Sequence, residues 1–242
     1  MKPLKGIVGP HESEEEAHAR MASLYPNQPV IDVFGFQCDW IPILYSNRAL
    51  APWEAACVWI EGNRVAMQLR KSLEKKKYYL GLVSKEELLQ HEAVHALRMA
   101  FDEPRFEEVL AYQTATSRWR RFLGPFFRTP RESQLFSILL ILFPIGFLFS
   151  FLASPLIALI AATTAYGFVR LIHTQSIFAR ARRRLSAWTE RPLALMLHLT
   201  DAEISLFARS DSQTIERFMS EQTSPRWRQI NHVFFSEPYC QC

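Results

Sequence analysis

The middle of this 242-residue chain carries no charged side chain from Ser133 to Val169. One straight helix of this length would measure about 55 Å, whereas the hydrocarbon core of a bilayer is about 30 Å thick. Two shorter helices fit better, and we expect them at 135–152 and 156–172. A turn is predicted at Ser154-Pro155, because proline disfavours helix in the residue before it. The run is too long and too uniformly apolar for a buried hairpin in a soluble protein, so it predicts a transmembrane hairpin.

Arginines lie on both sides of this apolar run. By the positive-inside rule, both flanking parts are expected on the cytoplasmic side. The sequence therefore predicts an integral membrane protein with two spans and both termini in the cytoplasm. Its expected parts are a cytosolic domain over 1–132, the hairpin over 133–172 and a C-terminal cytosolic region over 173–242. The arginines concerned are Arg118, Arg120, Arg121, Arg128 and Arg131 before the run, and Arg170, Arg180, Arg182, Arg183 and Arg184 after it.

Charge and cysteine content exclude two classes of protein. The net charge of +4, from 28 basic and 24 acidic residues, is too small to indicate a nucleic-acid partner. The four cysteines are few and irregularly spaced, so we expect no disulfide framework and a reducing compartment. Cys240 and Cys242 stand close together at the end of the sequence, and their role stays open.

Local patterns predict a β-hairpin and two helices in the first 132 residues. Alternating residues over 55–69, around Glu61-Gly62-Asn63, predict the β-hairpin. Ser84-Lys-Glu-Glu87 matches a capping box and predicts a helix over 85–101. Asp102-Glu103-Pro104 ends that helix, and a second is expected over 105–121. Elsewhere we expect helices at 11–24, 174–189, 201–208 and 212–221, and strands at 30–36 and 193–199.

His91-Glu92-Ala93-Val94-His95 lies inside the predicted helix over 85–101. The i, i+4 spacing puts both imidazoles on one helix face, one turn apart, where they can bind a single metal ion. Glu92 lies beside that face and can take a proton from a metal-bound water. These residue types in this pattern indicate hydrolytic metal chemistry.

A catalytic zinc site needs a third protein ligand and one position for water. The break near residue 102 predicts that the helices over 85–101 and 105–121 form an antiparallel hairpin. By symmetry, His95 then lies opposite Glu107 or Glu108, and either carboxylate could reach the metal. His91 falls opposite Ala111 or Tyr112.

The His-Glu-x-x-His motif, followed one helix later by Glu107-Glu-Val-Leu-Ala-Tyr112, resembles the gluzincin metallopeptidases over about residues 84–117. The resemblance implies Zn²⁺ bound by His91, His95 and Glu108, with Glu107 as the alternative third ligand. It implies that Glu92 is the general base. Val109 stands where the family has glycine.

The resemblance also implies further site residues. In this family an edge strand before the metal helix pairs with substrate, which points to Val65, Met67 and Leu69. Tyr112 would polarise a carbonyl, hold Glu108, or serve packing alone. The expected fold is α+β and mainly α: a zincin-like helical hairpin with a small β-hairpin, a two-helix transmembrane hairpin and a C-terminal soluble α/β segment.

The expected function is that of a membrane-anchored zinc metallopeptidase with its site in the cytosol near the bilayer. Its peptide or protein substrates could be membrane-proximal segments or loose cytosolic chains. One alternative is a non-enzymatic membrane protein that binds a partner through its cytosolic parts. Another is a di-iron carboxylate protein, because Glu15-Glu16-Ala-His18 and Glu92-Ala-Val-His95 both match Glu-x-x-His. The sequence leaves the oligomeric state open.

Overall fold

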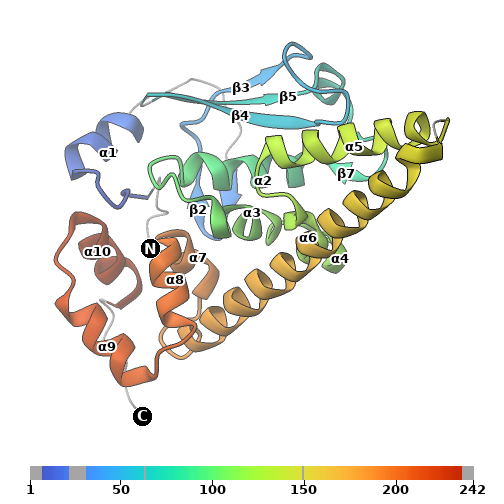
Figure 1. Ribbon diagram of the computed structural model, residues 1–242. Coiled ribbons are helices and arrows are strands. Elements are labelled where there is room, and N and C mark those ends of the chain that lie inside the picture. The colour runs from blue at the N-terminus through green and yellow to red at the C-terminus, as the bar shows by residue number, and fades with distance from the viewer. Residues whose placement is uncertain (1–6, 22–30, 63, 149, 236–242) are drawn as a thin grey trace.

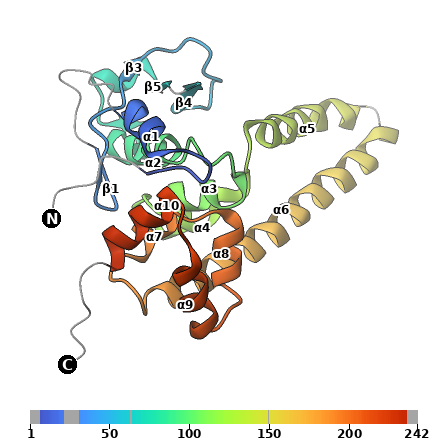
Figure 2. The same cartoon turned by 90° about the vertical axis from the view of Figure 1, so that its left-hand side faces the viewer.

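The computed structural model describes residues 7–21, 31–62, 64–148 and 150–235. A small sheet covers one side of a layer of helices, and a long helical hairpin projects from this body (Figure 1). C-terminal helices pack against the other side of the layer (Figure 2). Buried side chains from Ile7 to Ile230 belong to one hydrophobic core, so both ends of the chain contribute to the same body.

The largest sheet contains β3 (Ile43–Tyr45), β4 (Ala56–Glu61) and β5 (Arg64–Leu69) in the order β3-β5-β4. β4 and β5 are antiparallel, with Ala56 opposite Leu69, which confirms the predicted β-hairpin. β3 pairs with β5 in parallel, so β5 is the central strand. The predicted open edge at Val65, Met67 and Leu69 is therefore wrong, and these side chains are buried. In the described sheet β4 occupies the edge instead.

Helix α2 (Lys85–Leu97) begins where the sequence predicts. The Ser84 hydroxyl accepts a hydrogen bond from the Glu87 amide at 3.1 Å. The helix ends four residues earlier than predicted, because Arg98 turns into the core. There its guanidinium donates to the carbonyls of Leu197 and Leu199 at 2.8 and 2.9 Å.

The second predicted helix is divided in two. Helix α3 spans Pro104–Tyr112, with Pro104 in its first turn, and helix α4 spans Arg118–Leu123. Between them Thr114 closes a turn through hydrogen bonds to Ala111, and Ser117 is the N-cap of α4. Residues of this kind compete with helical hydrogen bonds, which explains the break.

Shorter elements surround these helices. They are α1 (Glu14–Met21), β1 (Asp32–Val33), β2 (Phe36–Gln37), the 3₁₀ turn η1 (Lys71–Glu74), β6 (Tyr78–Tyr79), β7 (Val83–Ser84) and the 3₁₀ turn η2 (Gly124–Phe126). β1 and β2 form one antiparallel pair, and β6 and β7 form another. The strand predicted over 30–36 is thus a tight hairpin where the structure describes it.

The projecting hairpin consists of α5 (Pro130–Leu148) and α6 (Ser150–Leu185), which pack against each other. The predicted turn at Ser154-Pro155 is wrong, because both residues lie inside α6. Apolar helices of this kind tolerate an internal proline. The basic helix predicted over 174–189 is the continuation of α6. Among the described residues, one helix segment has the length and composition to cross a membrane, Ser154–Leu185, and its apolar stretch is only 11% buried.

Polar contacts fix the base of this hairpin to the body. Arg170 on α6 donates to both carboxylate oxygens of Glu132 on α5, at 2.5 and 2.7 Å, and to the carbonyl of Phe126. Arg128 donates to the Thr174 hydroxyl at 2.6 Å. The direction in which α5 and α6 leave the body is therefore set by paired, directional hydrogen bonds.

The C-terminal region is helical throughout its described part: α7 (Pro192–Leu197), α8 (Asp201–Phe207), α9 (Ser212–Glu221), α10 (Pro225–Ile230) and a π turn over Asn231–Phe235. The strand predicted over 193–199 is wrong, because α7 begins with a proline and is rich in Leu, Ala and Met, which favour helix. The predicted α/β character is therefore absent from these described residues. The Thr200–Glu203 capping box is complete. Cys240 and Cys242 lie outside the described residues.

Candidate metal centre

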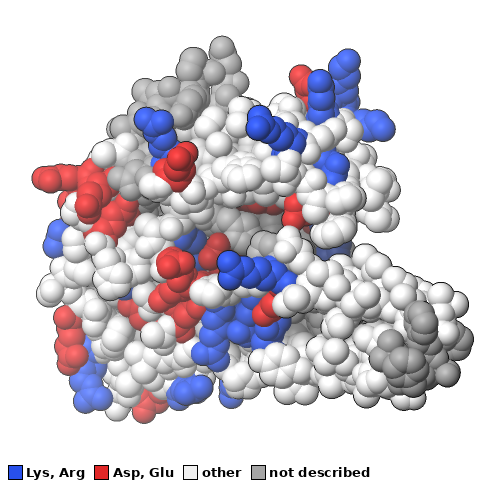
Figure 3. Space-filling model, turned by 45° about the horizontal axis from the view of Figure 1, so that its top comes forward, with Lys and Arg blue, Asp and Glu red and all other residues white. Residues whose placement is uncertain are grey.

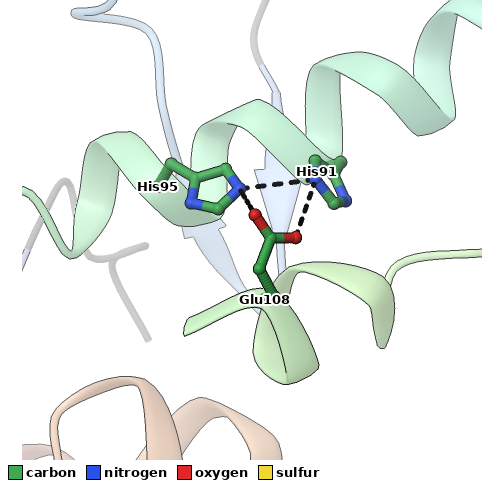
Figure 4. Close-up of side chains that lie close together, drawn as sticks. All are labelled: His91, His95 and Glu108. Atoms are coloured by element: carbon green, nitrogen blue, oxygen red, sulfur yellow. Dashed lines mark hydrogen bonds and ion pairs between the residues drawn. The ribbon is translucent and has the colours of Figure 1, made fainter. Parts of the chain in front are cut away.

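Helices α2 and α3 bring three potential metal ligands together. His91 and His95 project from the same face of α2, and Glu108 reaches towards them from α3 (Figure 4). One ligand atom from each residue lies within 4.8 Å of the other two. Within the described part of the chain, His91, His95 and Glu108 form the one group of histidine, cysteine or carboxylate side chains close enough together to share a metal ion. The antiparallel pairing of two helices predicted from the sequence thus brings these residues to one point.

The distance between the two histidine nitrogens matches that of two ligands of a tetrahedral zinc ion. The Nε2 atoms of His91 and His95 are 3.3 Å apart. Two ligands at 2.0–2.1 Å from a tetrahedral zinc ion would be separated by about 3.3–3.4 Å. The two Glu108 oxygens lie 3.8 Å from His91 Nε2 and 3.7 Å from His95 Nε2, slightly wider than this. A donor set of two imidazoles and one carboxylate fits zinc with one position left for water.

A second carboxylate and a backbone carbonyl orient the two rings. Nδ1 of His95 lies 2.6 Å from Oε1 of Glu107, which leaves Nε2 facing Glu108. The ring of His91 is hydrogen-bonded to the backbone of Ala111. Partners of this kind fix the tautomer of a metal-binding histidine. The two neighbouring glutamates therefore have different geometric roles, and Glu108 is the one that faces both Nε2 atoms.

The protonation of the two histidines differs because their neighbours differ. Burial, together with the charges of His95 and Arg120, lowers the pKa of His91 to about 3. Burial acts in the same direction on His95, but the hydrogen bond that its ring donates to Glu107 and the charges of Glu108 and Glu107 outweigh it and raise its pKa to about 9. Burial also raises the pKa of Glu108.

Glu92 lies next to the three ligands and lines the same cleft. It is 7% exposed, and its charge interacts with those of His95 and Glu108. Burial raises the pKa of Glu92 to about 7. A carboxylate with a pKa near neutrality can both accept and donate a proton at pH 7.

Tyr112 packs against the metal-facing side of α2. Its ring contacts His91 edge-on, with centroids 4.6 Å apart, and burial raises its pKa to about 12. The Tyr112 ring also packs against Gly124, where an added Cβ would overlap the ring. Tyr112 therefore contacts both His91 and the Gly124 backbone.

A distant residue sets the start of α3. The carboxylate of Asp201, the first residue of α8, accepts hydrogen bonds from the amides of Arg105 and Phe106 at 2.9 and 3.3 Å. Glu103 in turn accepts from the Asp201 amide at 2.7 Å. The C-terminal region thus caps the helix that carries Glu107 and Glu108. Asp201 was not predicted as a cap of α3, because its only local signal in the sequence is its position in the α8 capping box.

Glu87 links the loop after α3 to α2. It is 4% exposed, its Oε2 accepts from the Thr116 hydroxyl at 3.1 Å, and its Oε1 lies 2.8 Å from Nη2 of Arg120. Glu87 was predicted to complete the capping box at Ser84. The structure uses its side chain to fasten α4 beside the metal-facing residues instead.

A cleft of about 990 Å³ contains these groups. In Figure 3 acidic side chains are visible inside the hollow near the centre of the molecular face. The lining includes His91, Glu92, His95, Glu107, Glu108 and Tyr112, the edge strand β4 from Ala56 to Val58, the β6–β7 turn, and α4. Val65, Met67 and Leu69 are not part of this lining. The exposed His18 of α1 is not among the converging ligands either, which leaves the di-iron interpretation without its second Glu-x-x-His.

No known protein family, no curated protein and no solved structure matches this chain.

Proposed function

We propose that this protein is a membrane-anchored zinc metallopeptidase of the His-Glu-x-x-His type. The observation that supports it is the convergence of His91, His95 and Glu108 within 4.8 Å, in a cleft that also contains the buried Glu92. Zinc bound by these three residues would polarise a peptide carbonyl and lower the pKa of its bound water.

Three residues beside the proposed metal ligands each have a defined role in this proposal. Glu92 accepts a proton when water attacks a peptide carbonyl and passes it to the departing amine. Glu107 keeps His95 in the orientation in which Nε2 faces the metal. Tyr112 supports the ring of His91 from the side. Membership of the gluzincin family is part of this proposal, and experimental support for these roles would also support it.

The substrate is expected along β4 rather than β5. β4 is one of the two edge strands of the described sheet, and its residues Ala56, Cys57 and Val58 line the cleft, whereas no residue of the other edge strand, β3, does. An extended peptide can add to an open edge through main-chain hydrogen bonds. This would hold a scissile bond next to the metal-binding residues.

The membrane anchor in this proposal is the α5–α6 hairpin, with two spans and both flanking parts in the cytoplasm. The exposure of the apolar α6 segment and the arginines at both ends of the hairpin support this arrangement. Figure 3 shows the hairpin as an almost uncharged surface, with basic side chains gathered where it joins the body.

The test is metal analysis of the full chain purified in detergent, combined with a casein cleavage assay. The wild type should contain about one zinc per chain. Glu92→Gln should retain zinc and lose cleavage by about 10²–10⁴-fold, the usual contribution of a general base. Glu86→Gln, at an exposed position on the same helix, is the matched control and should cleave like the wild type. Undiminished cleavage by Glu92→Gln would falsify the proposed mechanism, and a chain that binds no zinc would contradict the proposed function.

A further inference from the structure

The mouth of the metal cleft is bordered by exposed apolar side chains on two sides. On one side the β6–β7 turn presents Leu80 and Leu82, which are 75% and 77% exposed. On the other side α4 presents Trp119, 74% exposed, and Leu123, 39% exposed. All four residues line the cleft. We call these two groups the apolar lips.

The β6–β7 turn exposes its leucines without any benefit to folding. Leu80 has φ +48° and Gly81 has φ +73°, and the Leu82 amide donates to the Tyr79 carbonyl at 2.9 Å. Positive φ at both central positions favours Asn-Gly or Asp-Gly in such a turn. A leucine in this backbone conformation, with its side chain in solvent, is unfavourable for a soluble hairpin tip.

All charged residues in the two segments that carry the lips, 75–82 and 116–131, are basic. Lys75, Lys76 and Lys77 directly precede β6 and are exposed. Arg118 and Arg120 flank Trp119 on α4, and Arg120 is paired with Glu87 of α2. Apolar and tryptophan side chains next to lysine and arginine are typical of protein surfaces that enter the headgroup layer of anionic membranes.

The lips also continue into the apolar hairpin. The lining of the cleft runs from His91 along Leu123 and Phe127 to Ser133, in the first turns of α5. The groove that holds the metal-binding residues therefore leads to the base of the helices proposed to span the membrane. Continuity and charge both favour a lipid surface as the partner of the lips.

We propose that the apolar lips insert into the headgroup region of the bilayer, so that the cleft receives its substrate from the membrane. The substrate class is then a segment of an integral membrane protein that leaves the bilayer next to a transmembrane helix. This substrate assignment rests on the proposed function. The insertion of the lips does not, and the two are tested separately.

Insertion is tested by fluorescence quenching of the full chain in liposomes of phosphatidylcholine and phosphatidylglycerol that carry brominated acyl chains. Quenching should fall clearly in Trp119→Phe, because the bromine atoms reach only residues within the bilayer. Trp59→Phe is the matched control, since Trp59 is 48% exposed on β4 and does not line the cleft. The quenched signal should be unchanged in this control. Equal quenching of the wild type and Trp119→Phe would overturn insertion.

The substrate class is tested with one casein-derived sequence, offered either free in solution or fused to a synthetic transmembrane helix in the same liposomes. Cleavage of the anchored form should be about tenfold faster or more, because both partners are confined to one surface. The double variant Leu80→Asp, Leu82→Asp should retain zinc and lose this preference. Leu44→Asp, which changes a 53% exposed leucine on β3, should keep it.

The remaining outcomes separate the two proposals. Equal cleavage of free and anchored substrate would overturn the substrate class while the metallopeptidase function stands. If the zinc-loaded protein cleaved neither form, the proposed function and its substrate class would both be overturned. The quenching experiment would still decide whether the lips lie in the bilayer.

Discussion

Nδ1 of His95 lies 2.6 Å from Oε1 of Glu107, and this hydrogen bond orients the ring so that its Nε2 atom faces Glu108. The two adjacent glutamates of α3 therefore approach the same histidine on opposite ring nitrogens. This separates two residues whose roles the sequence leaves interchangeable.

Glu107→Ala should weaken zinc binding by about 10–100-fold, the usual cost of losing a partner that orients a ligand. Glu108→Ala should weaken it further, because a ligand itself is lost. Glu86→Ala, at an exposed position of α2, should bind zinc like the wild type. Competition with a chromophoric chelator measures all three affinities. A larger loss in Glu107→Ala than in Glu108→Ala would reverse the assignment of the third ligand.

Gly124→Ala should lower both stability and zinc affinity. The added methyl group would overlap the Tyr112 ring and displace it, and this ring is in contact with His91. Overpacking of this kind costs about 1–3 kcal/mol of unfolding free energy. In the Tyr112→Ala background the same glycine substitution should have little further effect, because the ring it meets is gone. Additive losses in the double variant would show that the clash is elsewhere.

Asp201→Ala should affect the metal site from a distance. Loss of the hydrogen bonds to the Arg105 and Phe106 amides costs about 1 kcal/mol of unfolding free energy and loosens the start of α3. Zinc affinity should fall with it. Asp211→Ala removes a comparable side-chain cap, to the Thr214 amide at the start of α9, and should leave zinc affinity unchanged. Thermal unfolding and chelator competition on both variants distinguish a specific effect from general destabilisation.

His198 should make the fold sensitive to acid. Burial lowers the pKa of His198 to about 3, and the charges of Arg226 and Arg98 act in the same direction. The unfolded chain, with a pKa near 6.5, binds a proton that the folded chain excludes. Stability is therefore fully present above pH 6.5. It falls by up to about 1.4 kcal/mol per pH unit as the pH drops towards 3.

The measurement compares the wild type with His198→Asn by thermal unfolding between pH 4.5 and 7.5. The stability of the variant should fall less steeply than that of the wild type as the pH drops, because the titrating ring is absent. His11→Asn changes an exposed histidine and should keep the slope of the wild type. A wild-type slope in His198→Asn would contradict this account.

Helices α2 and α3 were predictable because their signals are local. Ser84 starts α2 as expected, and the break before Pro104 brings α3 back alongside it. The symmetry of this hairpin placed His91 opposite Ala111 or Tyr112, and the structure shows contacts of His91 with both. Helix caps and i, i+4 spacing depend on a few neighbouring residues, which a sequence displays directly.

The features that were not predicted depend on contacts between distant segments. β5 is a central strand because β3, more than twenty residues earlier, pairs with its other side. The Glu87 side chain bonds to Thr116 and Arg120 instead of completing the capping box, and these two residues lie in a loop and in a separate helix α4 where one continuous helix was predicted. The helix at Leu193 had a local signal in Pro192, but an apolar run of this length is ambiguous between strand and helix.

Because the residue that caps α3 comes much later in the chain, the order of synthesis determines when the site can form. Asp201 follows Arg105 by 96 positions, and the α5–α6 hairpin lies between them. A nascent chain that has delivered all three metal-facing side chains still lacks the residue that anchors Glu108's helix. The ribosome must therefore finish the whole α5–α6 hairpin and reach α8 before the helix that carries Glu108 can be anchored in its final position.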